Sequence, residues 1–224
     1  INWINTDTDY FGGGGSSDRD TYGATLYTSY SVDRLTIDVL FNYSFSDYAL
    51  TRSVDATTTA TGINNSDEIF LSAKVDYAFD VGRLAVKPGV RMDLVKVWMD
   101  AYTETGAGAD NVSYNAFDVT SFTTDVGGEV TYSCKVGAGT LTPRAFGYWV
   151  HEYQNDVQAL SYAIDGGVVQ SVLPASPARN YARVGAGASL DLQGGLEIYV
   201  DYQALVGLDR INSHQFAAGG RFEF

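Results

Sequence analysis

The segment RLTIDVLFNYSF, residues 34–45, decides the fold class of this chain because apolar and polar side chains alternate along it. In an extended conformation one face would be polar, with Thr36, Asp38, Asn42 and Ser44, and the other would be apolar, with Leu35, Ile37, Val39, Phe41, Tyr43 and Phe45. A period of two residues is typical of a β-strand that buries one face, whereas a helix repeats every 3.6 residues. The segment therefore predicts an all-β fold.

The same alternation recurs along the chain, including segments 69–79, 84–94, 196–206 and 214–224. The pattern predicts about ten strands, at residues 1–11, 20–31, 34–50, 67–80, 83–101, 120–136, 139–153, 180–192, 195–206 and 213–224. Most of them exceed the usual strand length of about 5–6 residues. Since a tilted strand needs about 9–11 residues to cross a bilayer, their length favours a membrane-spanning sheet.

The connections between these strands alternate between short and long. Short turns are expected at 32–33, 80–82, 137–138 and 193–194, and long connections at 12–18, 51–66, 102–119, 154–179 and 207–212. Outer-membrane barrels show this alternation, with short periplasmic turns and longer external loops. The long connections are rich in Thr, Ser, Asn, Asp and Gly, so they are interpreted as solvated, mobile loops.

Alternation by itself fits two folds, a soluble β-sandwich and an up-and-down barrel in lipid. In a sandwich the apolar face forms the core, whereas in a barrel it contacts lipid and the polar face lines the lumen. Backbone edges cannot be left unpaired in lipid, so a barrel sheet is expected to close. Strand length, loop alternation and aromatic residues near the strand ends favour the barrel; these aromatic pairs are Tyr43 and Phe45, Tyr77 and Phe79, Trp98 and Tyr102, Tyr148 and Trp149, and Phe222 and Phe224.

Composition excludes several classes of protein. The net charge of −13 over 224 residues argues against a nucleic-acid partner, which would need clustered Lys and Arg. No run of about 18 apolar residues is present, so no transmembrane helix is predicted. The first ten residues lack a basic region followed by an apolar core, so they do not form a signal peptide.

The polar face of the predicted strands carries charges of both signs. They either pair across strands and stiffen a hydrated wall, or contact a segment held in the pore. The residues predicted to face the lumen are Asp38, Lys74, Asp76, Lys87, Arg91, Asp93, Asp125, Glu129, Lys135, Arg144, Glu152, Arg183, Asp191, Glu197, Asp201, Arg221 and Glu223.

No catalytic or metal site is predicted, and no cofactor is expected. The two histidines, His151 and His214, lack neighbouring ligands at a spacing typical of metal sites. His151 and Glu152 are adjacent in a strand, so their side chains point to opposite faces. A protease at the barrel rim, pairing His151 with Asp156 or His214 with Asp209, is a weak alternative. The glycine-rich segment 12–17 lacks the Lys that ends a phosphate-binding loop.

The second half of the chain resembles the C-terminal β-barrel of autotransporters. The resemblance rests on the segments VGGEVTY (126–132), LTPRA (141–145), WVHEY (149–153), VGAGA (184–188), LEIYVDY (196–202) and GGRFEF (219–224). A weaker likeness covers VGRLAVKPGV (81–90). The terminal pair Phe222 and Phe224 is similar to the signal that the barrel-assembly machinery reads in outer-membrane proteins.

This resemblance implies an outer-membrane translocator and anchor, with a barrel of about twelve strands around a helix in the pore. It also implies a passenger upstream that is secreted to the surface of a Gram-negative cell. The partners would be outer-membrane lipid and lipopolysaccharide, the assembly machinery, and the chain's own passenger or pore helix. Because about ten strands are predicted, we expect the first strands, the pore helix and the passenger to precede residue 1. The alternatives are a structural or small-channel barrel and, less favoured, a barrel hydrolase.

Overall fold

The computed structural model describes residues 1–10, 14–137, 139–154, 159–165, 167–172, 178–192, 194–208 and 213–222. No helix within these ranges is long and apolar enough to cross a membrane. Antiparallel strands dominate the described residues, and their one helical element is the short 3-10 turn η1 (Gly108–Asp110). The prediction of an all-β, antiparallel fold is therefore confirmed.

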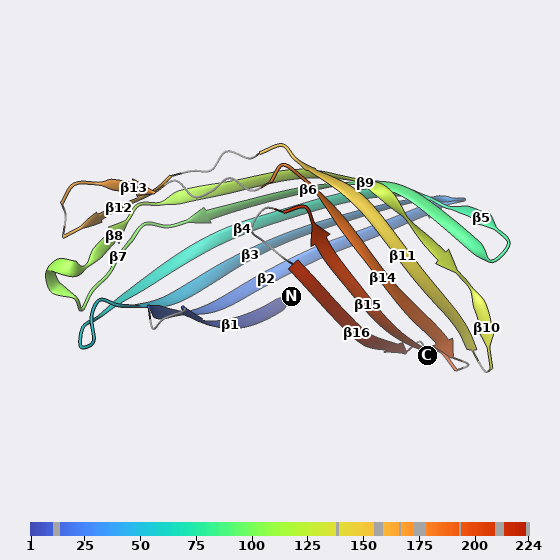
Figure 1. Ribbon diagram of the computed structural model, residues 1–224, viewed down its shortest axis with the longest axis horizontal. Coiled ribbons are helices and arrows are strands. Elements are labelled where there is room, and N and C mark those ends of the chain that lie inside the picture. Colours follow the sequence, from blue (N-terminus) through green and yellow to red (C-terminus); the bar gives the residue numbers. More distant parts are fainter. Residues whose placement is uncertain are drawn as a thin grey trace.

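Ten long strands form one sheet in which each pairs with the next along the chain (Figure 1). They are β1 (Asn2–Tyr10), β2 (Gly15–Val32), β3 (Leu35–Ser53), β4 (Thr59–Tyr77), β6 (Leu84–Met99), β9 (Phe117–Tyr132), β11 (Gly139–Glu152), β14 (Asn180–Leu192), β15 (Leu196–Val206) and β16 (Ser213–Phe222). Two short strands complete the sheet: β5 (Phe79–Val81) pairs with β6, and β10 (Cys134–Val136) pairs with β11. This up-and-down order confirms the predicted topology.

Strands β2 to β4 are longer than the sequence pattern predicted. The pairing of β3 with β4 is unbroken from Leu35 and Tyr77 to Ser53 and Thr59, so most of the connection expected at 51–66 is strand. The prediction failed here because both faces of these strand ends are polar, which removes the alternation on which it depended. Threonine-rich sequence still favours strand through its β-branched side chains.

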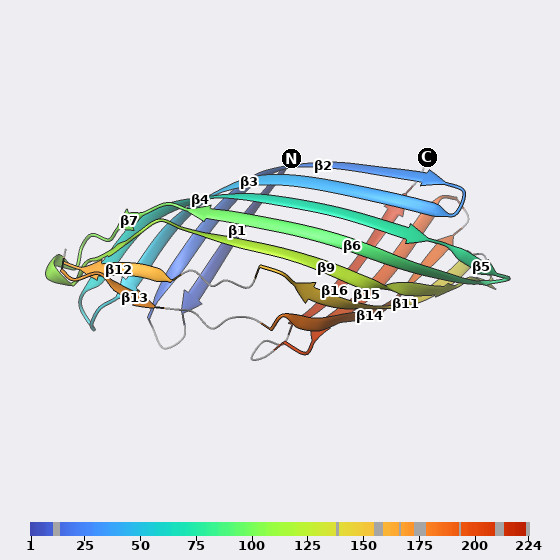
Figure 2. The same ribbon diagram turned by 90° about the horizontal axis from the view of Figure 1, so that it is seen from above.

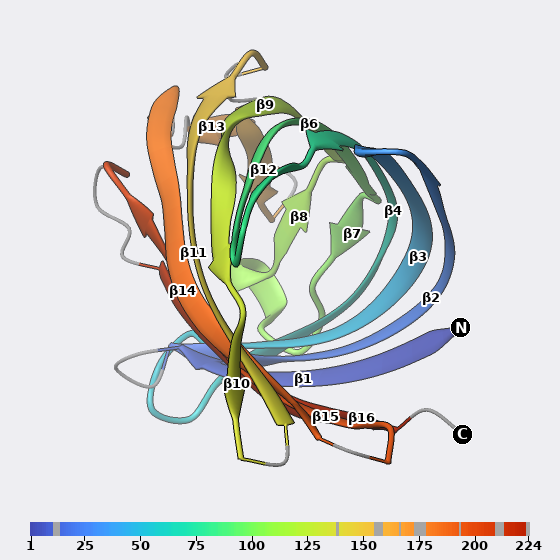
Figure 3. The ribbon, with the colours of Figure 1, turned by 90° about the vertical axis from the view of Figure 1, so that its right-hand side faces the viewer.

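The sheet is curled, so that one face is concave and the other convex (Figure 3). The register places side chains at paired positions on the same face, so Tyr22, Phe45 and Asp67 share one face with Trp3. Among the described residues no pairing joins β1 to β16. Figure 2 shows β1 and β16 separated from each other, at the two ends of the sheet. The expected closure is therefore not reached by these ten strands, which curl as a barrel wall does but leave two edges unpaired.

The apolar side chains of the long strands are not packed into a core. In the described part of the chain the buried apolar residues are only Ala60, Val112, Val150 and Ala204. On the convex face large side chains are open, such as Leu26, which is 71% exposed, and Phe216, which is 78% exposed. A soluble sandwich would bury such side chains between two sheets. The arrangement therefore contradicts the sandwich alternative.

A second, small sheet forms from the connections expected at 102–119 and 154–179. Its strands are β7 (Tyr102–Thr103), β8 (Val112–Tyr114), β12 (Leu160–Ile164) and β13 (Gln170–Val172), in the order β13-β12-β8-β7. It lies beyond the ends of β4, β6 and β9, at the left of Figure 1. The sequence interpretation of these connections as solvated, mobile loops did not include this sheet. Their pairing joins segments about fifty residues apart, which local patterns do not reveal.

Candidate functional site

The charged residues predicted from the sequence gather on the concave face of the large sheet. The register places Lys74 opposite Arg91, which lies opposite Asp125. Glu129 and Lys87 are paired in the same way, and Asp201 faces Gly187, the neighbour of Arg144 across β11 and β14. We call the charged wall the ten residues that ion pairs join on this face: Lys74, Asp76, Lys87, Arg91, Asp93, Asp125, Glu129, Arg144, Arg183 and Asp201.

Arg144 of β11 connects two carboxylates on different strands. Its Nη2 lies 2.7 Å from Oδ1 of Asp201 on β15, and its Nη1 donates a 3.2 Å hydrogen bond to Oε2 of Glu129 on β9. Lys87 of β6 lies 4.0 Å from the other oxygen of Glu129. The approach of Arg144 to Asp201 crosses over β14 at Gly187, where an added Cβ would lie 1.8 Å from Oδ1 of Asp201. The same Cβ would lie 2.7 Å from the backbone oxygen of Val200, which cannot move aside, so glycine is required at this position.

Asp125 of β9 is the most buried member of the charged wall, with a side chain only 2% exposed. One of its oxygens, Oδ2, lies 2.8 Å from Nη2 of Arg91 and 3.3 Å from Nη2 of Arg183. Arg91 also lies 3.0 Å from Asp93 through Nε. Lys74 and Asp76 form a further pair at 2.6 Å. The two arginines come from β6 and β14, so Asp125 ties together strands far apart in the sequence.

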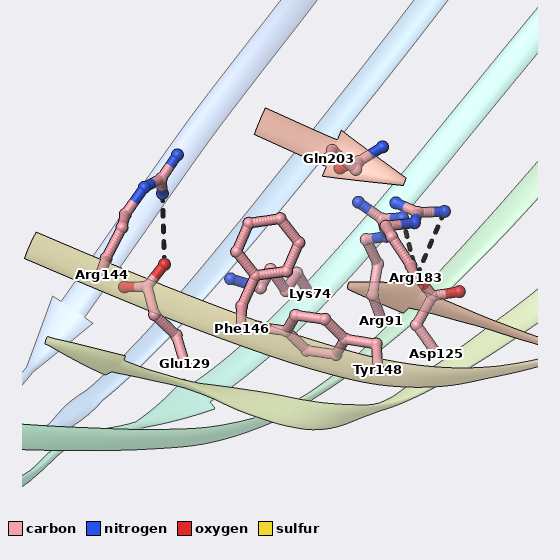
Figure 4. A pocket seen from close by; sticks show the side chains of 9 residues that line it. All are labelled: Lys74, Arg91, Asp125, Glu129, Arg144, Phe146, Tyr148, Arg183 and Gln203. Atoms are coloured by element: carbon pink, nitrogen blue, oxygen red, sulfur yellow. Dashed lines mark hydrogen bonds and ion pairs between the residues drawn. The ribbon is translucent and has the colours of Figure 1, made fainter. Parts of the chain in front are cut away.

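A cavity of about 220 Å³ opens on the charged wall. Figure 4 shows that Phe146 and Tyr148 of β11 lie between Arg144 and the Arg91–Asp125–Arg183 group, with Gln203 nearby. Tyr148 was predicted to sit with Trp149 among interfacial aromatics, which is wrong because adjacent strand residues point to opposite faces. That alternation rule would have placed Tyr148, Phe146 and Gln203 in the cavity from sequence. Tyr102 was misplaced too, since it stacks on Tyr114 in the small sheet.

The other predicted residues of this face lie apart from the charged wall. Asp38 accepts hydrogen bonds from Ser29 and Tyr27. Glu197 lies opposite both Arg221 and Asp191, and Lys135 lies opposite Thr140 near the short turns. Glu152 accepts from Ser121 and from the backbone N–H of Phe122, so it fastens β9 to β11. Glu223 and Phe224 lie outside the described residues, whereas Phe222 ends β16 and is exposed.

Both histidines lie in aromatic groups away from the charged wall. His151 stacks on Trp149, and its Nδ1 is 2.9 Å from Oδ1 of Asn180. His214 lies on Tyr202, with 2.8 Å between Nδ1 and the phenolic oxygen. Asp156 and Asp209, the suggested acidic partners, lie outside the described residues. In the described part of the chain no three His, Cys or acidic residues are grouped to hold a metal ion.

Comparison with known families decides the identity of this curled sheet. Residues 2–203 match the profile of the autotransporter beta-domain. The chain belongs to the autotransporter beta-domain family. Barrels of this family lie in the outer membrane, so the convex apolar face of this autotransporter domain contacts lipid and its strands are transmembrane. The resemblance read from the segments between 81 and 202 is thereby confirmed, and the segment 219–224 lies outside the matched residues.

The autotransporter fold is also found among solved structures. The chain is similar to the translocator domain of autotransporter NalP from Neisseria meningitidis, with a TM-score of 0.66 and 19% sequence identity. The match covers 94% of this chain and 68% of the NalP chain. At this identity the likeness establishes the shared fold. No curated protein sequence matches the chain significantly.

Proposed function

We propose that this autotransporter domain anchors an N-terminal passenger in the outer membrane of a Gram-negative bacterium and lets it pass to the cell surface. The observation that carries this function is the division of the sheet into two faces. Large apolar side chains are exposed on the convex face, and the charged wall occupies the concave one. A wall of this kind provides a polar passage through lipid while its backbone hydrogen bonds stay paired.

We further propose that additional strands pair with the free edges of β1 and β16 and close the barrel. Both edges would otherwise leave a row of backbone N–H and C=O groups unpaired in lipid. NalP supports this proposal because about a third of its chain lies outside the match. In the closed barrel, the concave face would form the lumen, and a helix of the upstream region would occupy it.

The test is the location of the passenger in cells that make the full-length protein. Protease added to intact cells should digest the passenger while the domain, from Asn2 to Phe222, stays protected in the membrane. A passenger protected in intact cells but digested after lysis would contradict translocation. The same cells also test the partners expected here, because depletion of the barrel-assembly machinery should leave the domain protease-sensitive in the periplasm.

A small-channel barrel is the second candidate, favoured by the open cavity beside Tyr148 and Gln203. Conductance of the full-length protein in lipid bilayers separates the two functions. A steady open channel, unaffected by removal of the upstream region, would favour the channel. No enzymatic role is proposed: replacing His151 or His214 by Ala should leave any hydrolysis measured with the purified protein unchanged.

A further inference from the structure

The charged wall is polarised, with its cations toward the cavity and its acids against the sheet. In the Arg91–Asp125 pair the side chain of Arg91 is 25% exposed and that of Asp125 is 2% exposed. Lys74 and Asp76 differ in the same direction, at 34% and 11%. In every ion pair of the charged wall among the described residues, the cationic side chain is more exposed than the acidic one. This includes the pairs of Lys87, Arg144 and Arg183.

This polarity gives the cavity a surface of hydrogen-bond donors. The ten residues of the charged wall carry five positive and five negative charges, so their sum is zero. Their arrangement still matters, because a group in the cavity lies closer to the cations than to the carboxylates. The electrostatic potential at that group is therefore positive. Arginine offers five N–H donors and no acceptor. Nε of Arg183 is buried without a hydrogen-bond partner, whereas Nε of Arg91 lies 3.0 Å from Oδ2 of Asp93.

Away from Lys74 and Asp76, the concave face of β2 to β4 carries scattered charges, such as Arg19 and Asp38, that lie apart from the charged wall. Apart from Asp76, the buried polar residues of β2 to β4 are small and carry hydroxyl or amide groups, namely Ser17, Ser44, Ser46, Asn64 and Ser66. Some of them form hydrogen bonds with polar neighbours, as Ser46 does with Thr21. An occupant of the curl would therefore meet the grouped cations on the side formed by β4, β6, β9, β11 and β14.

We propose that the charged wall binds a polypeptide segment that presents carboxylate side chains to Arg91, Arg144 and Arg183. This inference rests on the proposed function, because it specifies the chemistry of the segment held in the pore. Carboxylates match arginine because both can form paired, charge-assisted hydrogen bonds. Phe146 and Tyr148 separate the two arginine groups, so they would pack against the apolar part of the same segment.

Binding of two labelled peptides of equal length to the full-length protein in detergent tests the inference, because both must displace the same upstream segment from the pore and only their charge separates their affinities. One probe carries Glu and the other carries Lys at the same positions, and fluorescence anisotropy reports the affinity. The Glu peptide should bind about ten-fold more tightly, as expected for charge-assisted hydrogen bonds in a partly exposed site. Equal affinity for the two peptides, or a preference for the Lys peptide, would overturn it.

Two variants separate ligand binding from simple support of the sheet. Arg144→Gln removes hydrogen-bond donors and should weaken binding of the Glu peptide. Asp201→Asn frees the Arg144 guanidinium and should strengthen binding of the same peptide. If the pair only stiffened the sheet, both substitutions would shift binding the same way, and that outcome would refute the inference. Arg19→Gln is the control, because Arg19 lies on the concave face of β2 beside Tyr48, away from the charged wall.

Folding and function are checked separately from affinity. Each variant must keep the gel mobility of the folded barrel, and Arg183→Gln replaces Arg144→Gln if that one does not fold. A passenger that reaches the surface while the two peptides bind equally would end this inference and leave the translocator function standing. A passenger that stays inside the cell while the Glu peptide binds more tightly would support this inference and contradict the translocator function.

Discussion

Arg52 holds Glu104 across the join between the large sheet and the small one. Nη2 of Arg52 on β3 lies 2.7 Å from Oε2 of Glu104, which also accepts from the backbone N–H of Val112. Arg52 donates in addition to the backbone carbonyl of Asp110. The Glu104 side chain is only 6% exposed, so Arg52 replaces the water that this carboxylate lacks. The ion pair therefore fastens the small sheet to the rim.

Replacing Arg52 with Ala should release the small sheet without unfolding the barrel. The substitution leaves the Glu104 carboxylate buried and unpaired, at a cost of about 1–3 kcal/mol, discounted because Arg52 is partly exposed. Limited proteolysis of intact cells should then cut between Tyr102 and Tyr114. Arg19→Ala, which removes an arginine from the neighbouring strand, is the control, and equal cleavage in both variants would contradict the role of the pair.

Gly127 should tolerate no larger side chain, because β9 and β11 approach closely there. A Cβ at Gly127 would lie 2.0 Å from the backbone oxygen of Gly147. Backbone atoms paired in a sheet cannot give way as a flexible side chain does, so Gly127→Ala should reduce the yield of folded barrel. Gly147→Ala is the matched control, since its Cβ would meet nothing within 4 Å. Heat-modifiable mobility on gels measures both, and equal yields would refute the argument.

The small sheet should come apart at alkaline pH. Burial raises the pKa of Tyr102 and Tyr114, which stack with ring centres 4.8 Å apart. A raised pKa in the folded state means that stability is complete below the ordinary tyrosine pKa of about 10 and is lost as pH rises toward the folded value. Tyrosinate absorbance measured against pH should show tyrosines that ionise above the ordinary pKa, and Tyr102→Phe should remove one of them. Titration of every tyrosine near the ordinary value would count against this packing.

A charge in the centre of the convex face should prevent insertion. Leu26 lies on that face between Tyr22 and Tyr30 of β2 and is open to lipid. Leu26→Arg should cost about 2–4 kcal/mol, as for a cation near the midplane of a barrel. Thr25→Arg, on the concave face one residue away, should be milder. The amount of each variant recovered in the membrane fraction measures both effects. An unmodified chain that stays folded and monomeric in buffer without detergent would rule out the lipid-facing role.

Local patterns determined the strands and their faces. Alternation in segments such as 34–45 depends only on neighbouring residues, because each strand residue turns its side chain opposite to the next. The same rule separated His151 from Glu152 and assigned charges such as Lys74 and Arg144 to one face. It failed at Thr59 to Ser66, where polar residues dominate both faces and no alternation remains.

Only the tertiary structure decided which of these side chains meet. Asp125 lies between Arg91 and Arg183 because β9 has β6 on one side and β11 and β14 on the other, a relation between residues up to ninety positions apart. Long-range contacts also decide the small sheet and the ion pair between Arg52 and Glu104. The strand order of the whole sheet decides that β1 and β16 have free edges. The sequence determined this protein's strands and the two faces of its wall, because those depend on adjacent residues. The tertiary structure decided its contacts, because they depend on how the whole sheet curls.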